Sequence, residues 1–458
     1  MAPRRTSVAA TCLLGLVACR SVDPGPDYDH AVQEIRSATG AATVYHPDSA
    51  PAATADRIAE LLQDDLELSE AVELGLLNNP RLQAGFHNVG MAHADRVQAS
   101  MLTNPSLSAA LRFPTSGGAS EFEGGLFGSL LDIWQVPKRK RVAESALQRR
   151  ILELAQQAAL LASDIRAAYL QAIASDRLLA ISVENKASSR RLMELAEARL
   201  EAAAGTTIDA NLARLEFLDT EIALRDAEYA SGEAHRQLLT LLGFGPEKTG
   251  LRLVELSDDG PPPLPPLEEL KALALARRLD VRAAEEAVRQ ATAEVERQRG
   301  LFMRNVDIGI VAEKDGDWSV GPGVQLDLPL FDQNQAQVAK ALEAEAQREL
   351  VLVAIRLSAT QEVSSALARA EASWDTVAIY RTDILVRSEE TLVQARESYQ
   401  LGKTTMLPAL EAQRQLLAAR SAYARRLLHA ATALSDLERA TGTPRETLLI
   451  GHLEEDGR

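Results

Sequence analysis

The sequence has little cysteine and few aromatic residues. Its only two cysteines, Cys12 and Cys19, lie near the N-terminus, so the rest of the chain has no disulfide and must be stabilised by packing and association. Aromatic residues make up 4% of the chain, which is typical of helix bundles rather than of a thick mixed core. No run of 18 apolar residues occurs, and the sequence therefore predicts no transmembrane helix.

Glycine and proline are absent from two long stretches, residues 138–204 and 333–401. Both stretches are rich in Ala, Leu, Glu, Arg and Gln, which are good helix formers. At about 1.5 Å per residue, each would form a helix of roughly 100 Å. The chain is therefore predicted to be mainly α-helical, and its function has to use that length.

Apolar residues in both stretches alternate steps of four and three, the 3.5-residue period of a coiled coil. In the first stretch they are Leu147, Ile151, Leu154, Ala158, Leu161, Ile165, Ala168 and Ala172. In the second they are Val363, Leu367, Ala370, Trp374 and Val377, and then Leu385, Ser388, Leu392, Ala395 and Tyr399. An ordinary coiled-coil stalk is one interpretation that this pattern leaves open.

No catalytic constellation is present, and the histidines are scattered. His87 and His93 are six residues apart and would face different sides of a helix, so they do not fit metal-ligand spacing. The formal net charge of −16 disfavours nucleic acid and anionic membrane surfaces and suits a surface or lumen that cations tolerate. We predict no enzyme activity, no cofactor, no resident metal and no nucleic-acid partner.

The N-terminus has the pattern of a targeting segment. Arg4 and Arg5 precede an apolar run over residues 8–18, which is too short to cross a bilayer. The run ends in Leu-Val-Ala before Cys19, which resembles a bacterial lipobox, so we predict a lipoprotein signal peptide at 1–18 and lipidation of Cys19. A plain signal peptide that happens to contain Cys19 is the alternative. The polar, proline-containing residues 19–65 are interpreted as an extended N-terminal arm.

The pattern of breaks in the remaining chain occurs twice, at an offset of 197–200 residues, which indicates an internal duplication. The first repeat is predicted at 66–245, with strands at about 105–133 and the long helix at about 138–204. A Pro-rich linker at 246–266 leads to the second repeat at 267–443, with strands at about 305–330 and the long helix at about 333–401, and a C-terminal tail at 444–458 follows. Ala198-Arg199 before Gly205 aligns with Ala395-Arg396 before Gly402.

Four strands per chain cannot close a barrel, and open sheet edges are excluded from a bilayer. Apolar and polar residues alternate at Val306, Asp307 and Ile308, and again at Val324–Leu328, as in a barrel with lipid outside and water inside. Either several chains close one barrel together, or the strands form a small soluble sheet that caps a coiled coil.

Three strings in the sequence resemble the TolC-like outer-membrane efflux factors: LSEAVELGLLNNPRL at 68–82, LPLFDQNQ at 328–335 and ARESYQLG at 395–402. The middle string looks most like the cation-efflux branch of the cobalt–zinc–cadmium type. The resemblance implies long α-helical coiled-coil hairpins in two tandem repeats, with four β-strands per chain forming one third of a trimeric 12-stranded β-barrel. It also implies a lipid-anchored location in the bacterial outer membrane, extending into the periplasm.

The resemblance further implies a homotrimer that contacts outer-membrane lipid and works with a periplasmic adaptor protein and an inner-membrane efflux pump. Candidate adaptor contacts at the hairpin tips are Arg199, Gly205, Arg396, Tyr399 and Gly402. Candidate gate acids at the periplasmic aperture are Asp209 and Glu411, although a helix-capping role is equally available to Asp209. The predicted function is a trans-periplasmic exit duct for divalent heavy-metal cations. A multidrug or type I secretion channel and a structural periplasmic coiled-coil lipoprotein are the alternatives.

Overall fold

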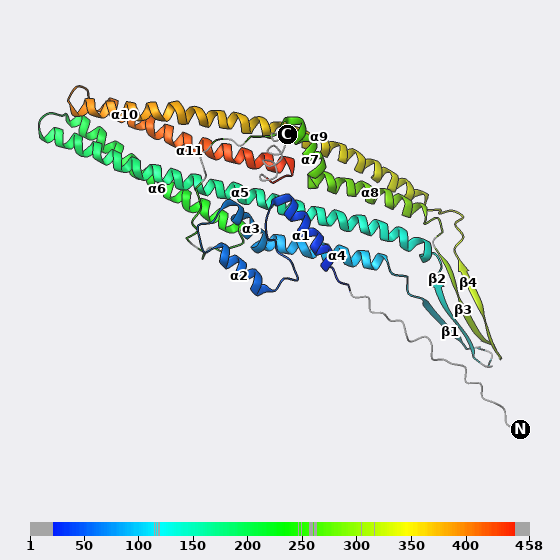
Figure 1. Cartoon of the computed structure of the whole chain (residues 1–458). Coiled ribbons are helices and arrows are strands. Elements are labelled where there is room, and N and C mark those ends of the chain that lie inside the picture. The colour runs from blue at the N-terminus through cyan, green and yellow to red at the C-terminus, as the bar shows by residue number, and fades with distance from the viewer. Residues whose placement is uncertain are drawn as a thin grey trace, which may run out of the picture.

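The computed structural model describes residues 22–444 except 114, 116, 118, 119, 246, 249, 256–259, 261, 262, 304 and 316. The predicted signal peptide, Cys19 and residues 445–458 of the predicted tail lie outside these residues. The described chain is an elongated helical body that carries a small sheet at one end, with two helical hairpin turns at the other (Figure 1).

The first half is built along one helix, α5 (Asp132–Glu201), which has 70 residues and would measure about 105 Å. The shorter helices α4 (Pro80–Ala99) and α6 (Thr207–Leu241) pack against α5 one after the other (Figure 1). Most of the predicted coiled-coil positions of α5, from Leu147 to Ala172, are buried in this packing. The first half therefore pairs one continuous helix with two shorter ones.

The second half repeats the arrangement with α7 (Leu267–Arg277), α8 (Leu279–Arg299), α9 (Gln335–Ile379), α10 (Leu385–Gln400) and α11 (Leu407–Thr441). The long helix predicted at about 333–401 runs over Gln335–Gln400, and Tyr380–Ile384 form a π-helical segment within it between α9 and α10. The coiled-coil positions show the reason: Val377 is followed by Leu385, a step of eight where the period requires seven. A π-helical turn accommodates one extra residue without breaking the helix.

The N-terminal arm predicted to be extended over 19–65 contains two helices, α1 (Gly25–Thr39) and α2 (Pro51–Leu61). Each has a proline in its first turn, Pro26 in α1 and Pro51 in α2, and the fixed φ of proline suits that position. Tyr28, Ala31, Val32 and Ile35 of α1 follow helical spacing and are buried in the main core. The prolines therefore mark the starts of helices, and the predicted extended arm is wrong over α1 and α2.

Helix α1 also connects the two halves of the chain. Arg282 of α8 donates two hydrogen bonds to the Glu34 carboxylate of α1, at 2.6 and 2.7 Å. Arg166 of α5 donates to the carbonyl of Thr39 at the other end of α1, at 3.0 Å. The hydrogen bond from Arg282 holds the pKa of Glu34 below its usual value.

Two of the three strings that resemble the efflux factors make helix junctions. Helix α3 (Leu68–Asn78) meets α4 at the asparagine pair, where the Asn78 and Asn79 side-chain amides donate to the last carbonyls of α6, those of Leu242 and Leu241, both at 2.9 Å. Asn334, before α9, has a left-handed backbone with φ of 66° and donates to the carbonyl of Gln298 at the end of α8, at 2.8 Å. These amides satisfy helix-terminal carbonyls that have no partner within their own helix.

The four strands form one antiparallel sheet in the order β1 (Ser106–Arg112), β2 (Glu121–Ser129), β3 (Val306–Asp315) and β4 (Asp317–Leu326). The pairing of β2 with β3 joins the hairpins of the two halves, with Leu126 opposite Ile310. Strands β1 and β4 are the two edges. The predicted fold class, mainly helical with four antiparallel strands in two tandem halves, is confirmed.

One helical segment of the described residues, Gln335–Gln400, is long and apolar enough to cross a membrane by length and composition. Most of its apolar window is exposed, including Leu350, Val353 and Leu357 of α9.

The contact between α5 and α6 contains a titratable pair. His235 of α6 donates from Nε2 to Asp176 Oδ2 of α5 at 2.9 Å, and Ser231 donates to Asp176 Oδ1 at 2.6 Å. The hydrogen bond to Asp176 raises the pKa of His235 and outweighs the opposing effect of burial. Burial raises the pKa of Asp176, but the hydrogen bonds from His235 and Ser231 outweigh it and leave that pKa below its usual value.

Protonation of His235 is therefore expected to stabilise the folded chain. Because its folded pKa is raised, this contribution is complete at pH values below the unfolded pKa of about 6.5 and is lost as pH rises through the folded pKa. The pair is partly exposed, so the effect is expected to be no more than about 1 kcal/mol. We expect the Tm of the wild type, measured in detergent, to fall as the pH rises from 5 to 8. The same fall of Tm with pH in His235→Gln would contradict a contribution from His235.

Candidate functional site

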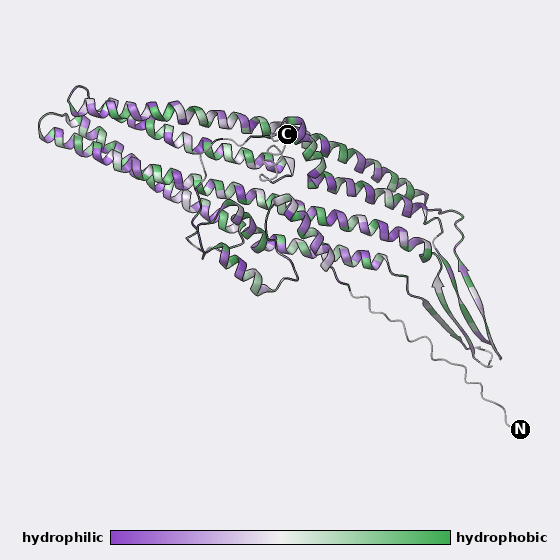
Figure 2. Cartoon of the chain, in the orientation of Figure 1, coloured by the Kyte–Doolittle hydropathy of each residue, from purple (hydrophilic) through white to green (hydrophobic). Residues whose placement is uncertain are grey.

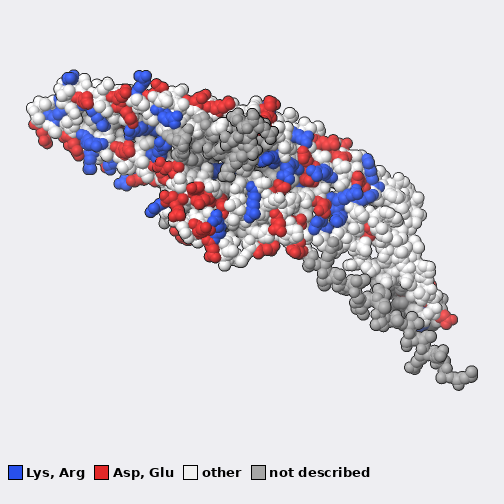
Figure 3. Space-filling view, in the orientation of Figure 1, with Lys and Arg blue, Asp and Glu red and all other residues white. Residues whose placement is uncertain are grey.

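The sheet has two faces of different chemistry, which the strand register defines. Leu126, Ile310 and Pro322 lie opposite one another and share the first face. Its exposed apolar side chains, which are 45–80% exposed, are Leu107, Leu111, Leu126, Ile308, Ile310, Trp318, Val320, Val324 and Leu326. We call this the apolar face. Green stretches alternate with paler and purple ones along the strands in Figure 2, and the sheet in Figure 3 is nearly free of charge except near its far end.

The opposite face of the sheet is polar and acidic. Its carboxylates are Glu121, Glu123, Asp307, Glu313 and Asp317, and its arginine is Arg112, which donates to Glu123 at 2.8 Å. We call this the acidic face. Strands β3 and β4 have 10 residues each, the length that a tilted strand needs to cross a bilayer. The sheet can therefore separate lipid from water, provided that its two edges are paired.

Phe127 lies on the acidic face over a row of glycines, an arrangement that the sequence analysis missed. Phe127 is paired with Gly309, which is paired in turn with Gly323. A Cβ atom at Gly309 would lie 2.1 Å from the Leu126 carbonyl oxygen and 2.7 Å from the Phe127 ring. Only glycine leaves room for the ring here, and the signal in the sequence is glycine inside strands.

The hairpin turns at the other end of the molecule have the same geometry. The amide of Ala204 donates to the carbonyl of Arg199, and that of Lys403 donates to the carbonyl of Ser398, each at 2.9 Å. The left-handed residues are Ala203, with φ of 54°, and Gly402, with φ of 69°. The alignment of Gly205 with Gly402 is therefore wrong in space, because the counterpart of Gly402 is Ala203.

Arg199 links the tips of the two hairpins. Its Nη1 donates to the carbonyl of Tyr399 at the end of α10, and its Nη2 donates to that of Ala204 at 2.8 Å. The guanidinium carbon lies 4.7 Å from the centre of the Tyr399 ring. Tyr399 is only 1% exposed, and burial raises the pKa of its hydroxyl. In this conformation Tyr399 holds the tips together and does not present its ring to a partner.

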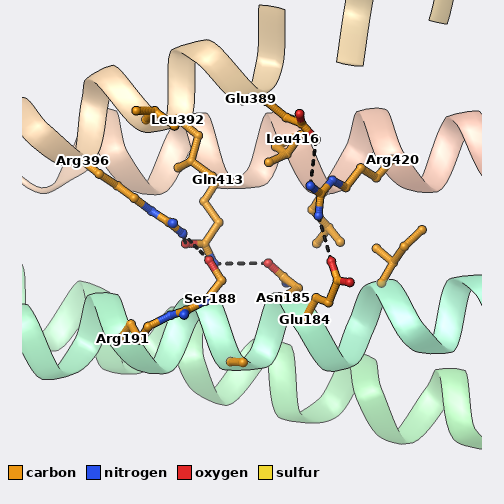
Figure 4. Close-up of a pocket in the computed structure, with 14 residues that line it drawn as sticks. Glu184, Asn185, Ser188, Arg191, Glu389, Leu392, Arg396, Gln413, Leu416 and Arg420 are labelled. Carbon is orange, nitrogen blue, oxygen red and sulfur yellow. Dashed lines mark hydrogen bonds and ion pairs between the residues drawn. The ribbon is translucent and has the colours of Figure 1, made fainter. Parts of the chain in front are cut away.

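Arg396 lies farther from the tip and points into a groove of about 460 Å³ between α5, α10 and α11 (Figure 4). It donates to Ser188 Oγ and, at 3.4 Å, to Gln413 Oε1, while Gln413 donates to Asn185 at 3.2 Å. Burial and the nearby Arg191 lower the pKa of Arg396. The sequence analysis missed Asn185, Ser188 and Gln413, because single polar residues in a long helix carry no motif.

The two predicted gate acids differ in their surroundings. Thr206 is the N-cap residue of α6, and its hydroxyl accepts a hydrogen bond from the Asp209 amide at 3.1 Å and donates to the Asp209 carboxylate at 2.9 Å. An acid in the first turn also interacts favourably with the helix dipole. Glu411 in α11 is exposed and accepts from Gln415 at 3.4 Å. Thr206 rather than Asp209 is thus the capping residue, and both gate assignments remain predictions.

A sheet with one lipid-compatible face and one acidic face, carried on helical hairpins of about 100 Å, defines a subunit of a membrane channel with a long extension into water. The family model described as "Outer membrane efflux protein" matches residues 71–244 and 270–443, once in each half. The chain belongs to the outer membrane efflux protein family. Members of this family are channels, not enzymes, and they work as trimers with an adaptor and an inner-membrane pump.

The names of the chain's relatives specify different cargoes. The cobalt-zinc-cadmium resistance protein CzcC of Cupriavidus metallidurans is 26% identical over 366 residues, covering 78% of this chain and 85% of the relative. The toluene efflux pump outer membrane protein TtgC of Pseudomonas putida is 22% identical over 455 residues, covering 91% of each. Among solved structures, CusC superposes with a TM-score of 0.70 at 20% identity, covering 83% of this chain and 92% of CusC. The outer-membrane channel OprN superposes with a TM-score of 0.71 at 19% identity, covering 89% and 95%.

Proposed function

We propose that three copies of this chain form the outer-membrane exit duct of a tripartite efflux system that exports divalent heavy-metal cations. The acidic face of the sheet carries this proposal. Three copies would close a barrel with the apolar face toward lipid and the acidic face toward the lumen. Carboxylates along the lumen would raise the local concentration of cations and repel anions.

A second cargo class has support of its own. TtgC, whose name specifies toluene efflux, aligns over more of the chain than CzcC does. The larger share of this chain that aligns with TtgC favours a duct for hydrophobic compounds. The acidic face favours cations, because an apolar cargo gains nothing from a ring of carboxylates.

The proposed partners occupy opposite ends of the molecule. Acylation of Cys19, six residues before the start of α1 in the sequence, would anchor the chain to the outer membrane. The adaptor would meet the hairpin tips, where Gly402 is exposed and Gly205, Arg199 and Arg396 are partly exposed. Asp209 and Glu411, near the same end, are the proposed gate acids.

The test of cargo is growth of a deletion strain on zinc, cobalt, cadmium, nickel, copper and silver, beside a panel of hydrophobic drugs. We expect sensitivity to cations that the wild-type gene reverses. A variant with Glu121→Gln, Asp307→Asn and Glu313→Gln is expected to reach the outer membrane but to restore metal tolerance poorly. The matched control neutralises Asp56, Asp64 and Asp65, exposed acids at or beside α2 and distant from the sheet (Figure 1).

Sensitivity to drugs alone would discard the cation cargo and retain the channel. Full metal tolerance in the variant neutralised on the acidic face would show that these carboxylates do not select the cargo. Equal loss of tolerance in the α2 control would contradict a role specific to the sheet.

A further inference from the structure

Two helices expose apolar side chains at intervals of seven residues. On α6 these are Ile208, Leu215, Ile222 and Tyr229, each 60–71% exposed, and we call them the α6 stripe. On α10 they are Val386 and Val393, 47% and 56% exposed, and we call them the α10 stripe. A seven-residue apolar repeat on an exposed helix is typical of one side of a coiled coil whose partner is missing.

The two stripes belong to helices on opposite flanks of the chain. Near the hairpin tips α6 packs mainly on α5, α5 on α11, and α11 on α10, so α6 and α10 are the outer helices (Figure 1). The sheet is arranged in the same way, because β1 of the first half and β4 of the second half are its two unpaired edges. A ring of copies needs each chain to present two different flanks that fit one another.

We infer that the α10 stripe of one copy packs against the α6 stripe of the next copy as an antiparallel coiled coil. Leu215 lies opposite Val393, and Ile222 lies opposite Val386. The occupant of each stripe is thus a second copy of this chain. This inference rests on the proposed trimeric duct and specifies the residues and register that close it.

The register follows from distances along the helices. Helix α6 starts at Thr207 and runs away from the tip, and α10 runs toward the tip and ends at Gln400. Leu215 and Val393 lie eight and seven residues from these ends, and Ile222 and Val386 lie 15 and 14 residues from them. The hydrogen bonds from Arg199 to Tyr399 and Ala204 place the two tips side by side. With Thr207 and Gln400 taken at the same depth, the residues of each pair differ in depth by about 1.5 Å, and the two pairs are about 10 Å apart.

Charged side chains beside the stripes fit this register. Arg225 of α6 and Asp383 of the π-helical segment are both exposed and lie 18 and 17 residues from the same helix ends. They have opposite charges and flank the layer formed by Ile222 and Val386. Glu389, which would approach Asp219 in this register, already accepts a hydrogen bond from Arg420 of α11 at 2.8 Å.

Cysteine cross-linking in outer-membrane vesicles tests the register, since the only native cysteines are Cys12 and Cys19. The full-length double variant Leu215→Cys/Val393→Cys is expected to run as a covalent trimer on a non-reducing gel. A reductant is expected to convert this trimer to monomers. Ile222→Cys/Val386→Cys is expected to behave alike. The mismatched pair Leu215→Cys/Val386→Cys is about 10 Å out of register, too far for a disulfide, and is expected not to cross-link. Each single-cysteine variant is a control for cross-linking through Cys19.

The outcomes separate this inference from the proposed function. A native trimer that cross-links only through the matched pairs supports the register. A native trimer in which the matched pairs fail, or the mismatched pair reacts equally well, overturns it and leaves the stripes to another partner, such as the adaptor. An unmodified protein that forms no trimer in the membrane overturns the trimeric duct as well.

Discussion

Replacing Val320 by arginine is expected to keep the protein from assembling in the outer membrane, whereas replacing the adjacent Ser319 by arginine is expected to be tolerated. Both residues are exposed and lie in β4, but Val320 is on the apolar face and Ser319 on the acidic face. An arginine that faces lipid near the middle of a membrane strand costs about 2–4 kcal/mol. Three copies would each bear that cost, while an arginine in a water-filled lumen bears almost none.

The measurement is membrane fractionation followed by gel analysis of the detergent-extracted protein without boiling. We expect the wild type and Ser319→Arg to run as SDS-resistant trimers, and Val320→Arg to be degraded or to remain outside the membrane fraction. Normal assembly of Val320→Arg would mean that the apolar face does not contact lipid. A failure of both variants would point to the loss of β4 itself, and the assignment of faces would then lack support.

The long helices and the strand pairs could be predicted because their signals are local. Absence of glycine and proline over residues 138–204, together with a 3.5-residue period, is sufficient to indicate one long helix. The π-helical segment was also visible in the sequence, as the step of eight from Val377 to Leu385, but a single shifted residue has meaning only once the helix is known to continue. Helices α1 and α2 were missed because prolines mark helix starts as well as extended chain.

The candidate site was less predictable, because its contacts join residues far apart in the chain. Asn185 and Gln413 meet across 228 positions, and Arg199 and Tyr399 across 200. Sequence similarity between the repeats aligned Arg199 with Arg396, yet Arg199 closes the tip and Arg396 points into the groove. A shift of one or two residues between repeats changes which face of a helix a side chain occupies, and alignment of short strings cannot detect it.

The link made by Arg199 leads to an expectation for the periplasmic end of the duct. A hydrogen bond from a charged donor contributes about 1.5–3 kcal/mol, and a cation–π contact adds about 0.5–2 kcal/mol. Arg199→Ala removes both from each copy, while the buried cluster around Leu192, Tyr399 and Met406 still holds the hairpins. A loss of about 2–4 kcal/mol per copy would shift the balance between joined and separated tips by roughly 30- to 1,000-fold.

Arg199→Ala is therefore expected to raise single-channel conductance in planar bilayers severalfold and to make cells sensitive to large hydrophilic antibiotics. Arg199→Lys, which keeps the charge but loses the planar fork of donors, is expected to be intermediate. The control is Arg190→Ala, since Arg190 is exposed and its contacts, Glu194 of α5 and Phe217 of α6, both belong to the first hairpin. If Arg199→Ala conducts like the wild type, the tips are held by the buried cluster alone. If Arg190→Ala conducts equally well, the effect belongs to α5 in general, because Arg199 donates to the second hairpin whereas these contacts of Arg190 lie within the first.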